Sequence, residues 1–355
     1  LLSSAAPIVI LRRRSASNLP DLISPDTEDI GAFLPYTPLH HLLLAEISPL
    51  VMTSANLRDE PIAVNSEKAQ HLLGPVADYI LDHNREIIRR CDDSVVKRLN
   101  GSRILLRRSR GFVPNPVELL NSSPPVLACG GDLKNTFCAT RENQAFLSQY
   151  IGDLEEYSAY QFFRTAVSDF LNLLGVSPEI IACDMHPDYQ SGELARRMAA
   201  GNKKIVTVQH HHAHIASCMT ENGVTDKVIG VALDGTGYGS DGTIWGGEFL
   251  IADLQESQRA GHFSKIALPG GDEAVKNPGR IALSMLYSAG FDIMNLDKII
   301  SPVKISAEER QVILQMIENG INSPLTSSAG RLFDGVSAML GLCQSVTYEG
   351  QVNHL

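Results

Sequence analysis

Residues 205–217 read IVTVQHHHAHIAS, and residues 228–239 read VIGVALDGTGYG. Each stretch begins as a short apolar run typical of a buried strand and ends in polar residues or glycines. The histidines begin where a helix could start, and a helix over residues 210–219 would place His210 and His214 one turn apart on one face. That spacing suits two ligands of one metal ion, although a histidine run can also form a solvated turn.

The glycine-rich end of the second stretch indicates how such a site could be completed. Asp234 follows the apolar run, and its carboxylate can join the two histidines as a third ligand. Gly235 and Gly237 have no Cβ and would let the backbone approach phosphate groups closely. Many glycine-rich loops only turn a hairpin, but the neighbouring histidines favour a metal or phosphate site here.

Length and composition limit the class of protein. The chain has 355 residues, which suggests two or more domains, and its 44% hydrophobic and 20% charged residues are typical of a globular protein. No apolar run approaches the roughly 18 residues of a membrane-spanning helix. The six cysteines form no C-x-x-C pair, which favours reduced thiols in a cytoplasmic protein. Residues 1–10 lack the order of a signal peptide and are expected to come from the middle of a domain.

Charge is distributed unevenly along the chain. Residues 1–117 hold 14 Lys and Arg against 13 Asp and Glu, whereas residues 118–355 hold 16 against 27. The acidic second part argues against a general nucleic-acid surface. Within the first part, residues 85–110 contain nine basic and three acidic side chains, which suits a phosphate-bearing small molecule, although a solvated basic face is the alternative.

The first domain is predicted to be α/β and to cover residues 1–117. A helix over residues 38–45 and a strand over residues 49–52 lead to Thr53-Ser54-Ala55-Asn56. Hydroxyls and an amide at a strand end can hold phosphate or ribose oxygens, although such a cluster is more often a turn or a helix cap. Arginines near strand ends can each direct two N–H groups at an oxyanion. The candidate nucleotide-binding residues of this domain are Thr53, Ser54, Asn56, Arg85, Arg90, Arg107 and Arg110.

Residues 118–125, which contain two serines and two prolines, are predicted to link this domain to a second one over residues 126–355. A strand over residues 126–129 leads to Gly130-Gly131-Asp132-Leu133-Lys134, which is similar to the first phosphate hairpin of the actin-like ATPase fold. Taken alone, Lys134 would be an ordinary exposed turn residue. A helix is expected over residues 155–174 because its apolar residues recur with helical spacing.

Motifs in both domains resemble the HypF family of hydrogenase-maturation carbamoyltransferases. In the first domain they are Thr53-Ser54-Ala55-Asn56, Glu60-Pro61, His83-Asn84-Arg85, Arg90-x-Asp92-Asp93-Ser94-Val95-Val96 and Arg107-Arg108-x-Arg110-Gly111. In the second they are Gly130 to Asn135, Cys183 to Tyr189, the histidine stretch, Asp234 to Gly239, Pro269-Gly270-Gly271-Asp272, Gly330-Arg331-Leu332-Phe333-Asp334 and Tyr348-Glu349-Gly350-Gln351. Seven motifs in the family's order make the second match specific.

The resemblance implies a fold of two α/β parts. The first would be a YrdC-like twisted-sheet domain without its N-terminal portion. The second would be a TsaD-like domain of the actin-like ATPase (ASKHA) class, with two RNase H-like subdomains and without its C-terminal portion. We therefore expect the chain to be a fragment of a longer cytoplasmic protein.

The resemblance also implies an AMP-forming activity. Carbamoyl phosphate and ATP would give carbamoyl adenylate in the first domain, and the carbamoyl group would pass to the C-terminal cysteine of HypE for cyanide ligand synthesis in [NiFe]-hydrogenase. The implied cofactors are ATP with Mg²⁺ and a zinc or iron ion, and no nucleic acid or membrane partner is implied. The implied catalytic residues are Lys134, His210, His214 and Asp234, the last three also as metal ligands. The further nucleotide-binding residues are Gly130, Gly131, Gly235, Gly237, Gly271 and Asp334.

Two other functions remain open on the sequence. A protein with the same two domain types could make threonylcarbamoyl adenylate and modify tRNA, although the acidic second part argues against that. A non-catalytic ATP-binding scaffold is the other, because actin-like folds often work by domain closure. Metal content distinguishes the scaffold from an enzyme, since a scaffold has no need of two histidines and an aspartate.

Overall fold

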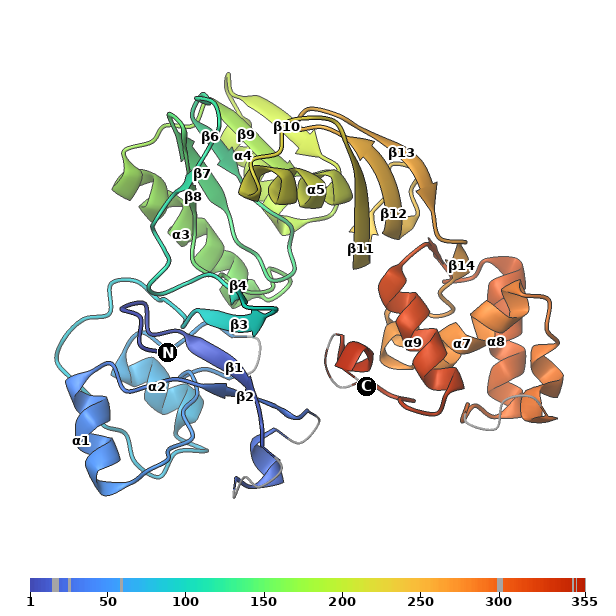
Figure 1. Cartoon of the computed structure of the whole chain (residues 1–355), viewed down its shortest axis with the longest axis horizontal. Coiled ribbons are helices and arrows are strands. Elements are labelled where there is room, and N and C mark those ends of the chain that lie inside the picture. The colour runs from blue at the N-terminus through green and yellow to red at the C-terminus, as the bar shows by residue number, and fades with distance from the viewer. Residues whose placement is uncertain are drawn as a thin grey trace. The chain divides into compact units, whose positions relative to one another are not determined.

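The structure, a computed structural model, describes residues 1–14, 19–24, 27–57, 60–298, 303–346, 348 and 350–354. The chain forms two compact units, Leu1–Thr207 and Val208–Leu355 (Figure 1). Among the described residues, no helix has the length and apolarity needed to cross a membrane. Glu349, from the last of the predicted motifs, lies outside the described residues.

A four-stranded sheet in the order β2-β1-β3-β4 organises the first 117 residues. Strand β1 pairs in parallel with β3 and antiparallel with β2. Asn100 and Gly101 connect β3 to β4, and both have the positive φ that a tight two-residue hairpin turn requires. The elements are β1 (Ile8–Arg12), η1 (Asp21–Ile23), β2 (Asp29–Ala32), α1 (Pro38–Glu46), α2 (Ser66–Leu73), β3 (Val95–Leu99) and β4 (Ser102–Arg107).

Helix α1 confirms the helix predicted over residues 38–45. It begins after Thr37, whose hydroxyl accepts a hydrogen bond from the His40 N–H (3.2 Å). The strand predicted over residues 49–52 is wrong, because these residues join no sheet. Pro49 has no N–H for a strand ladder, and the neighbouring Val51 is 77% exposed.

A six-stranded sheet in the order β10-β9-β6-β7-β8-β5 forms the rest of the first unit. Strand β6 pairs in parallel with β9 and antiparallel with β7. Helix α3, predicted over residues 155–174, packs Phe163 and Phe170 onto Phe137 in the core, where the rings meet edge to face. The elements are β5 (Val117–Glu118), β6 (Val126–Ala128), β7 (Cys138–Arg141), β8 (Gln144–Leu147), α3 (Tyr157–Leu174), β9 (Ile180–Asp184), α4 (Gln190–Ala199) and β10 (Lys204–Val208).

The second unit contains a five-stranded sheet in the order β11-β12-β15-β14, with β13 also paired to β12. Ile215 and Met219 of α5 pack on Ala232 and Leu250 of this sheet. Helices α6 to α9 form a second group in this unit, with Ile281 and Leu283 of α7 fully buried (Figure 1). The strands are β11 (Val228–Tyr238), β12 (Ile244–Ala252), β13 (Ser257–His262), β14 (Ile266–Ala267) and β15 (Leu325–Thr326). The helices are α5 (His210–Glu221), α6 (Asp272–Lys276), α7 (Pro278–Ser288), η2 (Ile293–Lys298), α8 (Ala307–Asn319), α9 (Ala329–Met339) and η3 (Gln351–His354).

Both units combine helices with mixed sheets, which confirms the predicted α/β class. All six cysteines are free thiols, as predicted. Residues 1–117 and 126–207 fall into one compact unit, and the second predicted domain continues into the other unit.

Candidate functional site

Two imidazoles and one carboxylate meet at the start of α5. The side chain of Gln209 accepts a hydrogen bond from the His212 N–H (2.9 Å) and caps the helix. One helical turn brings the Nε2 atoms of His210 and His214 to 3.2 Å from each other. Asp234 Oδ2 lies 3.3 Å from His210 Nε2 and 3.6 Å from His214 Nε2. The structure thus assembles the predicted ligand set, with its ligand atoms within 4.8 Å of one another.

An irregularity in the sheet presents Asp234 to the histidines. Strand β11 pairs regularly with β12 up to Leu233, and the register shifts before pairing resumes at Gly237. Such bulges redirect side chains next to functional sites. The hydroxyl of Ser328 holds the displaced backbone by donating to the carbonyl oxygens of Asp234 (2.9 Å) and Gly235 (2.8 Å).

The electrostatics of the cluster suit a divalent cation. Burial would raise the pKa of Asp234, but hydrogen bonds from His210 and His214 outweigh it and hold that pKa well below its ordinary range. The carboxylate therefore stays ionised at neutral pH. One carboxylate oxygen and two imidazole nitrogens are donors that zinc and iron take in catalytic sites, so the residues present fit such an ion.

A third imidazole lies behind the ligand set. His211 is fully buried, and its Nε2 atom lies 3.6 Å from Asp234 Oδ2. Its Nδ1 atom lies 3.3 Å from the side-chain nitrogen of Gln209. Burial lowers the pKa of His211 to about 4, so the ring is neutral at physiological pH. His211 therefore lies directly behind the Asp234 carboxylate, a placement that the spacing of His210 and His214 alone did not indicate.

The imidazoles of His210 and His211 leave no room for a side chain at position 237. A Cβ atom at this position would lie 2.5 Å from Cε1 of His211 and 2.8 Å from Cδ2 of His210, closer than side chains approach. The absence of a side chain therefore lets the histidines pack against β11. Nucleotide binding, the role predicted for Gly237, stays a prediction, and packing gives an independent reason for the glycine.

Replacing Gly237 with alanine should displace the imidazoles and weaken metal binding by about 10- to 100-fold, the range typical of changes next to metal ligands. Zinc affinity measured by competition with a chelator tests this. Gly261→Ala is the matched control, because a Cβ there would lie 3.9 Å from its nearest neighbour, Phe249. Equal zinc affinity in the two variants would contradict the packing role of Gly237.

A small pocket of about 190 Å³ in the first unit is lined by four of the predicted nucleotide-binding residues. These are Ser54, Asn56, Arg90 and Arg107. The segment Tyr150–Asp153, which follows β8, forms another wall. Asp92 also lines the pocket, where burial raises its pKa and the charge of Arg107 opposes that rise. Hydroxyl, amide and guanidinium groups together form a surface that suits phosphate and ribose oxygens.

The other three predicted residues of this domain lie elsewhere. Thr53 and Arg85 are exposed and do not line the pocket. Arg110 forms an ion pair with Asp93 (2.7 Å), stacks 3.9 Å above the ring of Tyr36 and donates to the carbonyl of Ala6 (2.9 Å). These contacts direct the donors of Arg110 at the protein's own acceptors, and nucleotide binding by Arg110 stays a prediction.

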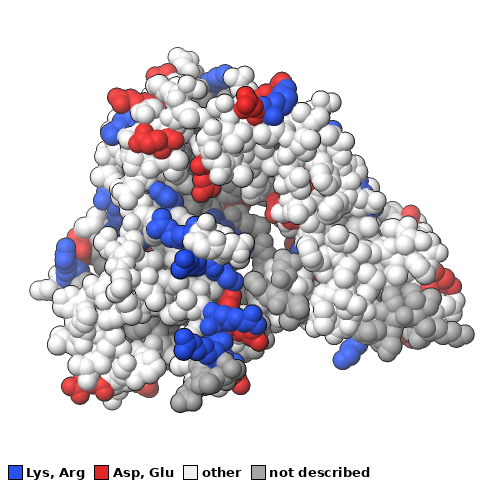
Figure 2. Space-filling view, in the orientation of Figure 1, with Lys and Arg blue, Asp and Glu red and all other residues white. Residues whose placement is uncertain are grey.

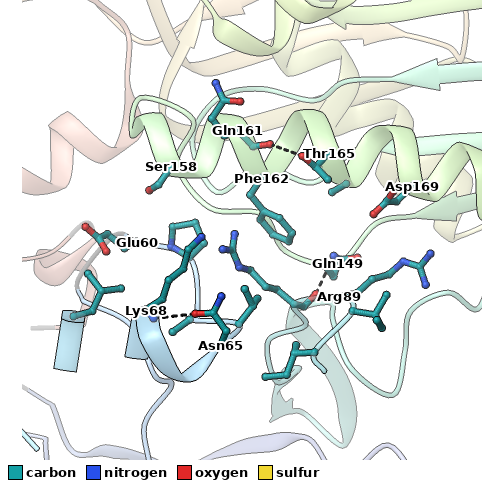
Figure 3. A pocket seen from close by; sticks show the side chains of 18 of the residues that line it. Glu60, Asn65, Lys68, Arg89, Gln149, Ser158, Gln161, Phe162, Thr165 and Asp169 are labelled. Atoms are coloured by element: carbon teal, nitrogen blue, oxygen red, sulfur yellow. Dashed lines mark hydrogen bonds between the residues drawn. The ribbon is translucent and has the colours of Figure 1, made fainter. Parts of the chain in front are cut away.

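A larger cavity of about 830 Å³ lies between α2 and α3 in the same unit (Figure 3). Lys68 and Asn65 come from the α2 side, while Gln161, Thr165 and Phe162 come from α3. Arg90 lines both this cavity and the small pocket, so the two spaces adjoin. In Figure 2, Lys and Arg side chains gather over the strands that Figure 1 labels β1 to β4.

The predicted phosphate hairpin is a rigid turn. Lys134 has φ +50°, and its N–H donates to the Asp153 carboxylate (2.5 Å). Gly130 has φ +73°, and a Cβ there would lie 2.4 Å from a backbone oxygen, so a glycine is required. Gly131 faces a more open space, because the nearest atom to a Cβ would be in the Tyr189 ring at 3.6 Å. Lys134 belongs to the first unit and the metal ligands to the second.

Two predicted residues of the second unit lie outside the metal cluster. Gly271 precedes α6 with φ +57°, and its nearest potential side-chain contact is Asn322 at 3.6 Å. Asp334 is 3% exposed and forms an ion pair with Arg331 (2.6 Å). Burial raises the pKa of Asp334. The carboxylate thus faces Arg331 of its own helix α9, and nucleotide binding by Asp334 stays a prediction.

Comparison with known families gives three consecutive matches. Residues 2–109 match the Sua5, YciO and YrdC family, described as "Telomere recombination". Residues 121–221 match "HypF Kae1-like domain". Residues 230–354 match "Carbamoyltransferase, Kae1-like Domain, second subdomain".

Individual relatives agree with these matches. Carbamoyltransferase HypF of Rhizobium leguminosarum bv. viciae is 41% identical over 99% of this chain and 46% of its own length. The protein of the same name from Synechocystis sp. is 40% identical over 99% of this chain and 47% of its own length. The chain thus spans about half the length of these relatives.

Solved structures show the same similarity. A crystal structure of full-length HypF in a phosphate- and nucleotide-bound form superposes with a TM-score of 0.93 at 40% identity, over 100% of this chain and 55% of that one. The crystal structure of T. kodakarensis HypF gives a TM-score of 0.90 at 37% identity, over 98% of this chain and 47% of that one. The chain therefore belongs to the HypF carbamoyltransferase family, with a Sua5/YrdC-like domain followed by Kae1-like domains.

Proposed function

We propose that this chain carries the activation and transfer steps of a carbamoyltransferase. The observation that supports this most directly is the cluster of His210, His214 and Asp234 in a chain of the HypF family. The phosphate- and nucleotide-bound form of a 40% identical HypF supports a nucleotide as one substrate.

Activation is assigned to the small pocket. A carbamate oxygen attacks the α-phosphorus of Mg-ATP, carbamoyl adenylate forms, and pyrophosphate leaves. Arg90 and Arg107 are positioned to balance the negative charge that develops on the phosphates, while Ser54 and Asn56 offer polar groups to the nucleotide. Carbamate itself would come from carbamoyl phosphate.

Transfer is assigned to the metal cluster of the second unit. A cysteine thiolate at the C-terminus of HypE attacks the carbamoyl carbon, the bond to AMP breaks, and a thiocarbamate forms. His210, His214 and Asp234 would hold a zinc or iron ion, which supplies Lewis-acid polarisation of the carbamoyl or phosphoryl oxygen. Phosphate binding is assigned separately to the hairpin of the first unit, where Gly131 leaves the backbone accessible to phosphate oxygens and Lys134 adds a positive charge.

ATP–pyrophosphate exchange tests the activation step. Carbamate supplied as ammonium carbamate should stimulate exchange catalysed by the 355-residue chain, without any need for carbamoyl phosphate cleavage. Arg107→Ala should lower that exchange by about 10- to 100-fold if one charge-assisted contact of roughly 1.5–3 kcal/mol is lost. Arg85→Ala is the control, because Arg85 lies outside the pocket. Stimulation by threonine and bicarbonate in place of carbamate would instead support the tRNA-modifying function.

A further inference from the structure

The two arginines of the small pocket each lie over an aromatic ring from the Kae1-like part of the chain. The guanidinium carbon of Arg107 is 4.9 Å from the ring centroid of Tyr150, and that of Arg90 is 5.1 Å from the ring centroid of Phe162. All four residues belong to the same compact unit and line the same pocket. We propose that Tyr150 and Phe162 are positioning residues that hold these two guanidinium groups for nucleotide phosphates, an inference that rests on the proposed function of the pocket.

Tyr150 begins a segment that is hydrogen-bonded to the phosphate hairpin. The segment that begins with Tyr150 pairs with the phosphate hairpin, because the N–H of Ile151 donates to the carbonyl of Asn135 (2.9 Å) and the N–H of Asn135 donates to the carbonyl of Gly152 (2.9 Å). These bonds position the backbone next to Tyr150. Arg107 ends strand β4, so the ring limits the directions its long side chain can take.

The position of Phe162 is set by helix α3. It lies on helix α3, one residue before the fully buried Phe163, and projects into the cavity (Figure 3). The guanidinium group of Arg90 lies over its ring. The side chain of Gln149 donates to the backbone carbonyl of Arg90 (3.1 Å), which adds a second contact between the two parts. The Nε atom of Arg90 is buried and makes no hydrogen bond in the structure.

This arrangement favours phosphate binding for two reasons. A guanidinium group that already lies over a ring loses less side-chain freedom when it binds an anion than one that moves freely. Stacking also leaves the N–H groups at the edge of the guanidinium plane, where they can meet phosphate oxygens. The affinity of the YrdC-like part for a nucleotide therefore depends on rings from the Kae1-like part, although the arginines that would contact the phosphates belong to the YrdC-like part.

Leucine substitutions test the role of the rings. Tyr150→Leu and Phe162→Leu remove the aromatic faces while keeping an apolar side chain, and each should weaken Mg-ATP binding by about 3- to 30-fold, the strength of one cation–π contact. Isothermal titration with Mg-ATP, pyrophosphate and adenosine measures the effect. Affinity for Mg-ATP and pyrophosphate should fall, and affinity for adenosine should not change, because the rings act through groups that contact phosphate.

Conservative variants separate positioning from general packing. Tyr150→Phe and Phe162→Tyr keep the rings and should bind Mg-ATP as the parent chain does. Tyr157→Leu is the matched control, since Tyr157 begins the same helix as Phe162 but is 75% exposed and stacks on neither arginine. Far-UV circular dichroism checks that each variant is folded, and if Tyr150→Leu is unfolded, Phe162→Leu alone decides.

The possible failures are distinguishable. If Arg107→Ala weakens Mg-ATP binding and the leucine variants bind normally, the rings have no positioning role and the inference is wrong. Equal losses for adenosine and pyrophosphate would also overturn it, because they would indicate a general collapse of the pocket. If Arg107→Ala itself binds Mg-ATP normally, the nucleotide does not use this pocket, and both the inference and the proposed site of activation fail.

Discussion

Replacing His210 and His214 together with alanine is expected to abolish metal binding and carbamoyl transfer while carbamate-dependent ATP–pyrophosphate exchange continues. The two imidazoles supply two of the three ligands in the cluster with Asp234, so the affinity for zinc should fall by more than about 100-fold, beyond the effect of changing an outer-shell partner. Exchange should persist because Arg90 and Arg107 belong to the other unit. Metal content by mass spectrometry, exchange, and carbamoylation of a peptide that ends in cysteine are the three measurements.

His212→Ala is the matched control for this experiment. His212 lies on the same helix, but its Nε2 atom is 2.8 Å from the carbonyl oxygen of Asp253 and does not join the ligand set. This variant should retain the metal and both activities. Equal loss of exchange and transfer in the double alanine variant would contradict the division of the two steps between two sites. Retention of the metal would mean that other residues bind it.

The metal cluster could be predicted from the sequence because two of its ligands lie in one short stretch of the chain. His210 and His214 follow an apolar strand and are separated by one helical turn, and both features are visible in a single stretch. Asp234 was predictable as the residue after the next apolar run. His211 was not, since its proximity to Asp234 depends on how deeply α5 is buried against β11, and that depth is a tertiary property.

The arginines show where prediction from the sequence stops. Arg107 and Arg110 are three residues apart in one motif, and both were predicted to bind a nucleotide. The structure places Arg107 in the pocket, whereas Arg110 faces Asp93 and Tyr36 from distant parts of the chain. The direction of the strand could not distinguish Arg107 from Arg110. The partners of Arg110 are distant in the sequence, and only the folded sheet brings them near. The burial of Asp334 beside Arg331 is likewise a tertiary property that the motif did not indicate.

Replacing Glu248 with alanine should destabilise the second unit by about 3–5 kcal/mol, the usual cost of removing one partner from a buried ion pair. Glu248 is fully buried and pairs with Arg259 (2.7 Å). Its other oxygen accepts the hydroxyl of Ser327 (2.5 Å). Urea unfolding followed by circular dichroism measures the loss. Glu256→Ala is the control, since Glu256 is exposed, pairs only loosely with Lys227 (3.4 Å), and should cost no more than about 1 kcal/mol.

The dependence of this loss on pH gives a further test. Burial would raise the pKa of Glu248, but hydrogen bonds from Arg259 and Ser327 outweigh it and hold that pKa below the ordinary 4.5. A carboxyl group with a lowered pKa in the folded protein contributes stability above its unfolded pKa and loses it as the pH falls through the folded pKa. The difference in unfolding free energy between the parent chain and Glu248→Ala should therefore narrow below about pH 4.5. A difference that does not change with pH would mean that shape, rather than the charge of Glu248, is what stabilises this region.

Glu248 also connects stability to the metal centre. Ser327, which donates to Glu248, is followed by Ser328, which holds the backbone carbonyl of Asp234. Loss of the buried carboxylate should therefore loosen the segment that presents Asp234 to His210 and His214, and zinc affinity should fall by about 10-fold or more. If zinc affinity in Glu248→Ala equals that in Glu256→Ala while stability is lost, the buried ion pair supports the fold alone and the metal centre is positioned by its bulge.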